Sequence, residues 1–223
     1  MRALWLVGLG LTGILSITLA SRECTSNGSE SDYLRKVATS RDVTWWLKAW
    51  SDIRGELNWE VCAYHPDWPA PTVSVKDTTW LYELRPALVL SPSGRKALNY
   101  LGVEFVASVG VPVFVGEMDE TVVLLDLNSR TWSQVMSCGT ACAIQVADWF
   151  GSDAFAVCGE TEVPGGKGSS RALCIHVFDL ARDSVLTFQG PMVTDDARSR
   201  FWALSEKWKR TRFPGVVWDM FEK

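Results

Sequence analysis

The sequence predicts a mainly β fold of antiparallel meanders, with an amphipathic helix at each end. Short runs of β-branched and aromatic residues, separated by turn residues, recur across residues 72–191. Apolar residues repeat with a helical period before this region, over 40–55, and again after it, from about residue 194. The same strands would also suit a β-sandwich, which is the alternative arrangement.

Residues 1–20 are predicted to be a signal peptide or signal anchor. A positively charged start precedes residues 3–20, which carry no charge, and Thr18 and Ala20 are the small residues expected before a cleavage site. Cleavage would leave Ser21 as the first residue. A single-pass membrane anchor is the alternative, because the apolar stretch is close to the shortest length that spans a bilayer. We therefore expect a secreted or otherwise extracytoplasmic protein.

The remaining chain has the composition of one globular domain. Hydrophobic residues make up 47% of the 223 residues and charged residues 22%, ordinary values for a chain that buries a core. The polar start of 21–39 predicts a flexible arm, and the domain is expected over 40–223. The formal net charge of −4 disfavours nucleic-acid binding. The expected partner is a protein, with membrane contact only if residues 1–20 are retained.

Residues 40–55 are predicted to form a helix that packs on the core. Ser40 suits its N-cap, and Gly55 suits its end. Its apolar residues share one face, and they are Val43, Trp46, Leu47, Trp50 and Ile53. The tryptophans would also suit a stacking platform for sugars or bases, but such a stripe more commonly covers a core.

The central region predicts short strands. It begins with a connection, 65–71, whose prolines exclude helix and the interior of a sheet. The predicted strands are 72–75, 87–90, 96–101, 103–109, 111–116, 121–127, 131–136, 143–147, 154–158, 172–180 and 184–189. The glycine-rich segment 163–170 predicts an exposed loop between two of them.

The chain is predicted to return to helix near its end. Thr194 or Asp195 would cap this helix, and an apolar stripe follows. The stripe consists of Phe201, Leu204 and Trp208. Pro214 ends the helix, and the apolar tail 216–221 is expected to dock on the domain.

The chain has six cysteines, an even number that suggests disulfides in an exported protein. Two cysteines flank the glycine-rich loop and would face each other across a hairpin. Two more bracket a short loop, and elimination leaves a pair that would pin the N-terminal arm. The expected pairs are Cys158–Cys174, Cys138–Cys142 and Cys24–Cys62.

Metal binding is the alternative role for the cysteines. Cys138 and Cys142 would supply two thiolates, but a zinc site needs a second pair of ligands at suitable spacing. His65 and His176 are the only histidines, and they form no recognisable pair motif. We therefore predict no metal and no cofactor.

Two segments, 122–132 and 175–185, share a pattern of apolar strand, Asp-Leu, polar turn and second strand. Their aspartates, Asp126 and Asp179, are 53 positions apart (179 − 126). This pattern resembles the strands of β-propeller blades of the kelch or WD-repeat kind, and 91–96 is similar to a turn of such blades. The β region is too short for a closed ring, so the resemblance implies two or three blade-like meanders that present loops to a partner.

The sequence after residue 20 contains no G-x-S-x-G, H-E-x-x-H, P-loop or G-x-G-x-x-G motif, and no catalytic residue is singled out. We therefore expect an exported, non-enzymatic binding or interaction protein. One alternative is an extracytoplasmic hydrolase of a polymer such as carbohydrate, using carboxylates such as those of 117–120 and the twelve tryptophans. The other is a membrane-anchored component of a complex.

Intact-mass measurement of the mature protein, with and without reduction and thiol alkylation, tests the export prediction. We expect the loss of residues 1–20, because the segment has the three parts of a cleavable signal. A retained N-terminus with every thiol free would contradict the secreted protein and reopen the metal-binding alternative.

Overall fold

The structure is a computed structural model, and it describes residues 30–65, 72–74, 83–101, 103–106, 110–114, 120–163 and 170–218. The helices are α1 (Glu30–Val37), α2 (Arg41–Arg54), the short 3₁₀ helix η1 (Arg85–Ala87) and α4 (Asp195–Arg212). The strands are β1 (Glu60–His65), β2 (Thr72–Ser74), β3 (Val89–Leu90), β4 (Lys96–Asn99), β5 (Val103–Val106), β6 (Val111–Phe114), β7 (Glu120–Asp126), β8 (Thr131–Cys138), β9 (Cys142–Trp149), β10 (Ala154–Glu162), β11 (Arg171–Asp179) and β12 (Ser184–Val193).

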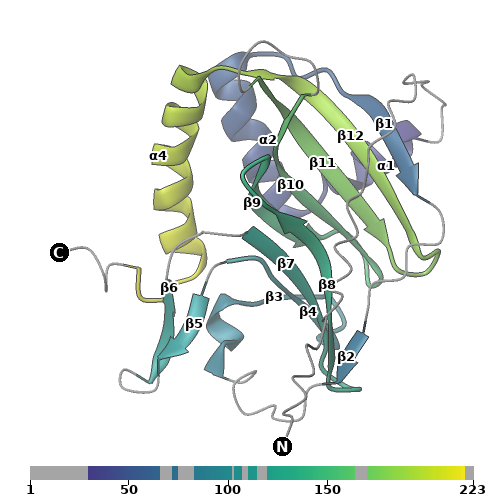
Figure 1. Cartoon of the computed structure of the whole chain (residues 1–223), viewed down its shortest axis with the longest axis vertical. Helices are drawn as coiled ribbons and strands as arrows, with labels where there is room; N and C mark the ends of the chain where they lie inside the picture. Colours follow the sequence, from purple (N-terminus) through teal and green to yellow (C-terminus); the bar gives the residue numbers. More distant parts are fainter. Residues whose placement is uncertain are drawn as a thin grey trace, which may run out of the picture.

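The fold is mainly β, with antiparallel meanders flanked by helices, as the sequence predicts (Figure 1). Sheet A has the strand order β1-β12-β11-β10-β9, and sheet B has the order β2-β8-β7-β4-β3. Each sheet is thus a meander of four strands with one outer strand added from the N-terminal part of the chain. The pair β5–β6 forms a small separate sheet. Within the described residues, neither five-stranded sheet closes on itself.

Sheet A is buried on both faces. Helices α2 and α4 lie over one face (Figure 1). There, Trp46, Trp50 and Phe201 share a buried cluster with strand residues such as Ile175. The other face packs on sheet B, and Phe155 of β10 belongs to that second core. An antiparallel sheet covered on both faces needs apolar residues at nearly every position. Strand β10 accordingly holds six consecutive buried residues.

A β-bulge changes the side-chain alternation of β9. Strand β10 pairs Cys158 with Val146 but Gly159 with Ile144, so Gln145 is the additional residue. Ile144 packs toward sheet B, whereas Gln145 and Val146 both reach the helical layer. The bulge therefore adds a polar side chain to the helix-covered face without displacing an apolar one.

Helix α2 follows the sequence prediction closely. The Ser40 side chain accepts a hydrogen bond from the Val43 amide, and Gly55 ends the helix with a φ of 86°. Trp46 and Trp50 are fully buried, so they contribute to the core rather than to an exposed stacking platform. Helix α1, by contrast, occupies part of the predicted flexible arm, and its Val37 is fully buried.

Helix α4 begins where predicted, with the Thr194 side chain accepting from the Ala197 amide. The predicted stripe is only partly right, because Leu204 is 46% exposed. The buried face of α4 consists of Ala197, Phe201, Ser205 and Lys209. Two near-parallel ring stacks join α2 and α4, and they are Trp45–Trp208, with centroids 4.3 Å apart, and Trp50–Phe201, with centroids 4.5 Å apart. These stacks fix the two helices side by side.

The cysteine pairings are only partly as expected. Cys138 and Cys142 form a disulfide that closes the connection between the two sheets. Cys158 and Cys174 are free, buried thiols, so the expected hairpin bridge is absent. Cys158 pairs across the hairpin with Ile175 and shares its helix-facing side, whereas Cys174 lies one position earlier and points to the opposite face.

The remaining expected pair includes Cys24, which lies outside the described residues. Cys62 lies on β1, and its Sγ approaches Oε1 of Gln189 at 3.6 Å. Strand β1 was not among the predicted strands, the first of which began at residue 72.

The bulge generates a stability prediction. A Cβ added to Gly159 would lie 1.9 Å from the Ala143 carbonyl oxygen, so Gly159→Ala forces the backbone of β9 to shift. We expect a loss of about 1–3 kcal/mol in the free energy of unfolding, the usual cost of overpacking. The matched change Gly151→Ala meets nothing within 4 Å and should stay within about 0.5 kcal/mol of wild type. Chemical denaturation measures both, and equal effects would contradict the tight contact.

Candidate functional site

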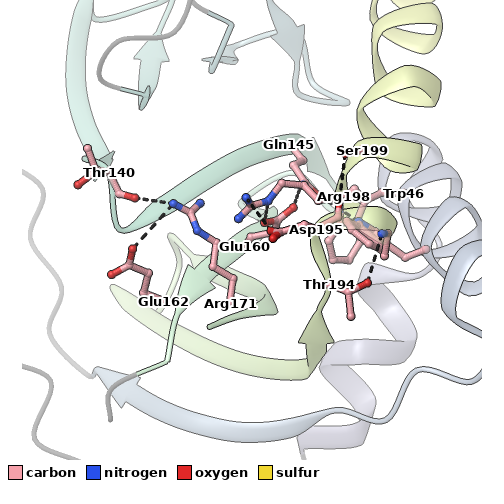
Figure 2. A network of polar contacts seen from close by, with 12 residues as sticks. Trp46, Thr140, Gln145, Glu160, Glu162, Arg171, Thr194, Asp195, Arg198 and Ser199 are labelled. Atoms are coloured by element: carbon pink, nitrogen blue, oxygen red, sulfur yellow. Dashed lines mark hydrogen bonds and ion pairs between the residues drawn. The ribbon is translucent and has the colours of Figure 1, made fainter. Parts of the chain in front are cut away.

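Two groups of charged residues distinguish this fold, one buried beneath the helices and one around an open pocket. The buried group begins with Gln145, which the bulge directs toward α2. Its Oε1 accepts hydrogen bonds from the indole nitrogens of Trp46, at 2.7 Å, and Trp50, at 3.1 Å. Its Nε2 donates to Oε1 of Glu160 at 2.7 Å (Figure 2). One side chain thus links a helix to two strands.

Glu160 is a fully buried carboxylate, and it has two partners. Its Oε2 accepts a hydrogen bond from Nε of Arg198 at 2.9 Å, and Gln145 occupies Oε1 (Figure 2). Arg198 stands in the first turn of α4, where Asp195 lies 3.8 Å from its guanidinium. A buried charge is tolerated only when such partners replace its water. Glu160 therefore holds the start of α4 against sheet A.

A second buried group holds the end of α4. The Asp42 amide donates to Oδ2 of Asp148 at 2.9 Å, and Arg212 Nε donates to Oδ2 of Asp42 at 2.7 Å. Burial and the neighbouring Asp148 charge raise the pKa of Asp42, and the charges of Arg212 and Arg41 offset this only in part. Because Asp42 is fully buried and Asp148 is 8% exposed, both carboxylates face protein atoms. We interpret this group as structural.

A third contact secures the disulfide loop. Nη2 of Arg171 donates to the Thr140 carbonyl oxygen at 2.6 Å, and Glu162 lies 3.9 Å from the same guanidinium (Figure 2). Thr140 stands between Cys138 and Cys142, so Arg171 of β11 ties this connection to the middle of sheet A.

Apart from these buried contacts, charged residues also surround an open pocket of about 380 Å³ where turns of both sheets meet. The turn between β3 and β4 supplies Ser93, Arg95 and Lys96 to its wall. The β7–β8 turn adds Asp126 and Asn128, and the β9–β10 turn of sheet A adds Ser152 and Asp153. Its volume falls in the range of small-molecule sites, roughly 300–1,000 Å³.

The turns on this side are built alike in the two sheets. Oδ1 of Asp126 accepts from the amides of Asn128 and Ser129, and Oδ1 of Asp179 accepts from the Ala181 amide. In each sheet, the amide of the residue after the aspartate donates to an earlier turn of the same sheet. The Leu127 amide donates to the Arg95 carbonyl oxygen in the β3–β4 turn, and the Leu180 amide donates to the Asp153 carbonyl oxygen in the β9–β10 turn. Arg130 and Asp183, again 53 positions apart, both have positive φ, 59° and 47°.

The surroundings of Asp126 stabilise its charged form. Partial burial raises the pKa of Asp126, but hydrogen bonds from Ser129 and Asn128 and the charge of Lys96 outweigh it, so the pKa is lowered overall. Nζ of Lys96 donates to Oδ1 of Asp153 at 2.6 Å, an ion pair that joins sheet B to sheet A across the pocket. Asp126 therefore gives the wall a charged hydrogen-bond acceptor.

Of the residues considered for chemistry from the sequence, the structure describes the side chains of His176 and Glu120, which lie in different sheets. His176 contacts Thr187 Oγ1 through Nδ1 at 3.0 Å on neighbouring strands, and the His65 side chain lies outside the described residues. In the acidic segment 117–120, only Glu120 is described, and its carboxylate accepts from the Ile144 amide. Among described residues, no group of three or more His, Cys, Asp or Glu side chains is placed to hold a metal ion.

Sequence reasoning found Asp126 and the 91–96 turn through the blade-like pattern, but it missed Ser152 and Asp153. No motif marks these two residues, because only the packing of the two sheets brings their turn to the pocket.

Within the described part of the chain, no helix has the length and apolar character that a membrane crossing requires. Comparison with protein-family models, with curated proteins and with solved structures finds no match for this chain. The function therefore has to be inferred from the site itself.

The opposite pKa shifts of Asp42 and Asp126 predict how the free energy of unfolding depends on pH. Because the pKa of Asp42 is raised by folding, its contribution to stability is highest at acid pH and declines as the pH rises from about 3 toward 7. The difference in unfolding free energy between wild type and Asp42→Asn should fall over that range. The lowered pKa of Asp126 predicts the reverse trend for Asp126→Asn.

Chemical denaturation at stepped pH measures both differences. Trends of the same sign in the two variants would contradict the assignment of one buried, destabilised carboxylate and one stabilised carboxylate.

Proposed function

We propose that this chain is an exported, non-enzymatic binding protein whose pocket at the turns of the two sheets is the binding site. The pocket itself is the observation that carries the proposal. Three turns from both sheets contribute to one wall, and the wall has donors in Arg95 and Asn128 beside acceptors in Asp126 and Asp153. Convergence of a few polar groups in one concavity is typical of ligand sites.

The charge state of the pocket favours binding over hydrolysis. Glycoside hydrolysis by a pair of carboxyl groups requires one that stays protonated as the general acid. The pKa of Asp126 is lowered, and Asp153 shares an ion pair with Lys96. The lowered pKa disfavours a protonated Asp126, and the ion pair engages one oxygen of Asp153. A charged Asp126 instead suits a ligand hydroxyl as a hydrogen-bond acceptor.

The blade-like arrangement supports the same proposal. We take the two meanders to be related as blades of the propeller type, because their turns share hydrogen bonds and positive φ at a fixed spacing. Repeated units of this kind present loops at one end to a partner. The proposed partner is an extracytoplasmic protein, which the pocket contacts directly or through a group that the protein carries.

Site-specific photo-crosslinking tests the proposal. A benzoylphenylalanine replaces Asn128 at the pocket and, as the matched control, Ala181, which holds the same place in the second turn and is also exposed. In the cells of origin, irradiation should give a discrete adduct from position 128 and little from position 181.

Equal yields from both positions would contradict a binding site at this pocket. Release of soluble fragments from a polysaccharide by the purified protein, lost in Asp126→Asn, would contradict the non-enzymatic assignment in favour of a hydrolase.

A further inference from the structure

The β11–β12 turn of sheet A, which follows Asp179, shows what a turn of this kind can bind. Tyr33 of α1 lies over this turn, and its hydroxyl donates to Oδ2 of Asp179 at 3.1 Å. Nη1 of Arg182 donates to the same hydroxyl oxygen at 2.6 Å. A hydroxyl is therefore held between a carboxylate and a guanidinium, and Oδ1 of Asp179 remains committed to the turn amide.

The corresponding turn of sheet B, between β7 and β8, is built in the same way but does not hold the Tyr33 hydroxyl. Asp126 uses Oδ1 for the turn amides, as Asp179 does. Among the described residues, no hydroxyl from another element lies on Asp126, and the pocket opens beside it instead. Arg95 also lines this pocket, and its guanidinium forms no ion pair with a described residue. A carboxylate and a guanidinium thus stand at one cavity, as they do around Tyr33.

The charge balance of the pocket restricts the ligand. Arg95 and Lys96 are matched by Asp126 and Asp153, so the wall has no net formal charge. A charged ligand would be attracted by one pair of these groups and repelled by the other, so the wall gives neither an anion nor a cation a net electrostatic advantage. A ligand without net charge can use donors and acceptors of both kinds without that repulsion.

The polarity of the wall restricts it further. Every side chain that lines the pocket is polar or charged, so the lining includes no aliphatic or aromatic residue on which a phenol ring could pack. Tyr33 differs in this respect, because its ring packs beside the apolar core beneath α1. A compact molecule with many hydroxyls can donate to the carboxylates and accept from the guanidinium at the same time.

We infer that the pocket binds a neutral saccharide, with Asp126 accepting a sugar hydroxyl and Arg95 donating to a sugar oxygen. This inference rests on the proposed binding function and names its ligand. The sugar is either free or attached to the partner protein, since both sources present the same hydroxyls.

An array of immobilised neutral and acidic glycans, probed with the mature protein, tests the inference. We expect retention on a subset of neutral glycans. Asp126→Asn keeps an Oδ1 acceptor for the turn but loses the charge, and it should weaken binding roughly tenfold or more, as should Arg95→Ala. The matched changes Asp179→Asn and Arg182→Ala lie in the β11–β12 turn, which Tyr33 occupies, and should alter the affinity for the glycan less than about twofold. Cooperative thermal unfolding of Asp126→Asn and Arg95→Ala, well above the temperature of the array, shows that both variants are folded and that the loss is local.

Calorimetric titration with the free oligosaccharide of the best array position, and with a glycoprotein carrying it before and after enzymatic deglycosylation, distinguishes the two sources. Binding in either form, weakened by Asp126→Asn, supports the inference. Absence of retention on every neutral glycan, or retention that Asp126→Asn leaves unchanged, overturns it. A crosslink from position 128 that survives deglycosylation of the partner would retain the proposed binding function while excluding the saccharide.

Discussion

Sheet A has apolar side chains on both faces, and the arrangement of the other layers follows from that constraint. One face must be covered by helices and the other by a second sheet, since neither can be left to water. Glu160 is the polar exception within the helix-covered face, and its carboxylate needs partners there. Gln145 and Arg198 supply them, so the buried charge specifies where α2 and α4 lie on the sheet. The bulge in β9 is part of the same solution, because it turns Gln145 toward the helices.

The layer order also explains why two similar turns have different surroundings. Helix α1 belongs to the helical layer, so it reaches the outer turn of sheet A, where Tyr33 lies on Asp179. Sheet B lies on the opposite side of sheet A, and among the described helices none of that layer contacts Asp126. The open pocket is thus a consequence of where the helices are placed. It lies on the boundary between the sheets, where Lys96 and Asp153 connect them.

The sequence predicted those features whose causes are local. The caps Ser40 and Thr194 specify helix starts through hydrogen bonds to amides three residues away. Ser40 was predicted outright, and Thr194 was one of two predicted caps, the other being Asp195. The fate of Cys158 and Cys174 depends instead on strand register, because a shift of one residue moves a side chain to the other face. Leu204 has helical spacing but lies away from the sheet, and only the docking of α4 decides which face is buried. The pocket was not predicted as a site: the sequence singled out Asp126 only as part of a repeated pattern, and Asp153 reaches the pocket only through sheet packing.

Two aspartates show how the fold separates stability from recognition. Asp42 is buried beside Asp148, which makes its charge unfavourable, and Arg212 compensates for this from the end of α4. Its Oδ2 accepts the hydrogen bond from Arg212, and the whole carboxylate is closed to solvent. Asp126 stays charged because turn amides and Lys96 stabilise it while it remains open to solvent. Such a carboxylate can accept a ligand hydroxyl with little rearrangement, because the turn that orients it is already formed. The core can therefore be held by buried ion pairs while the pocket residues remain available to a partner.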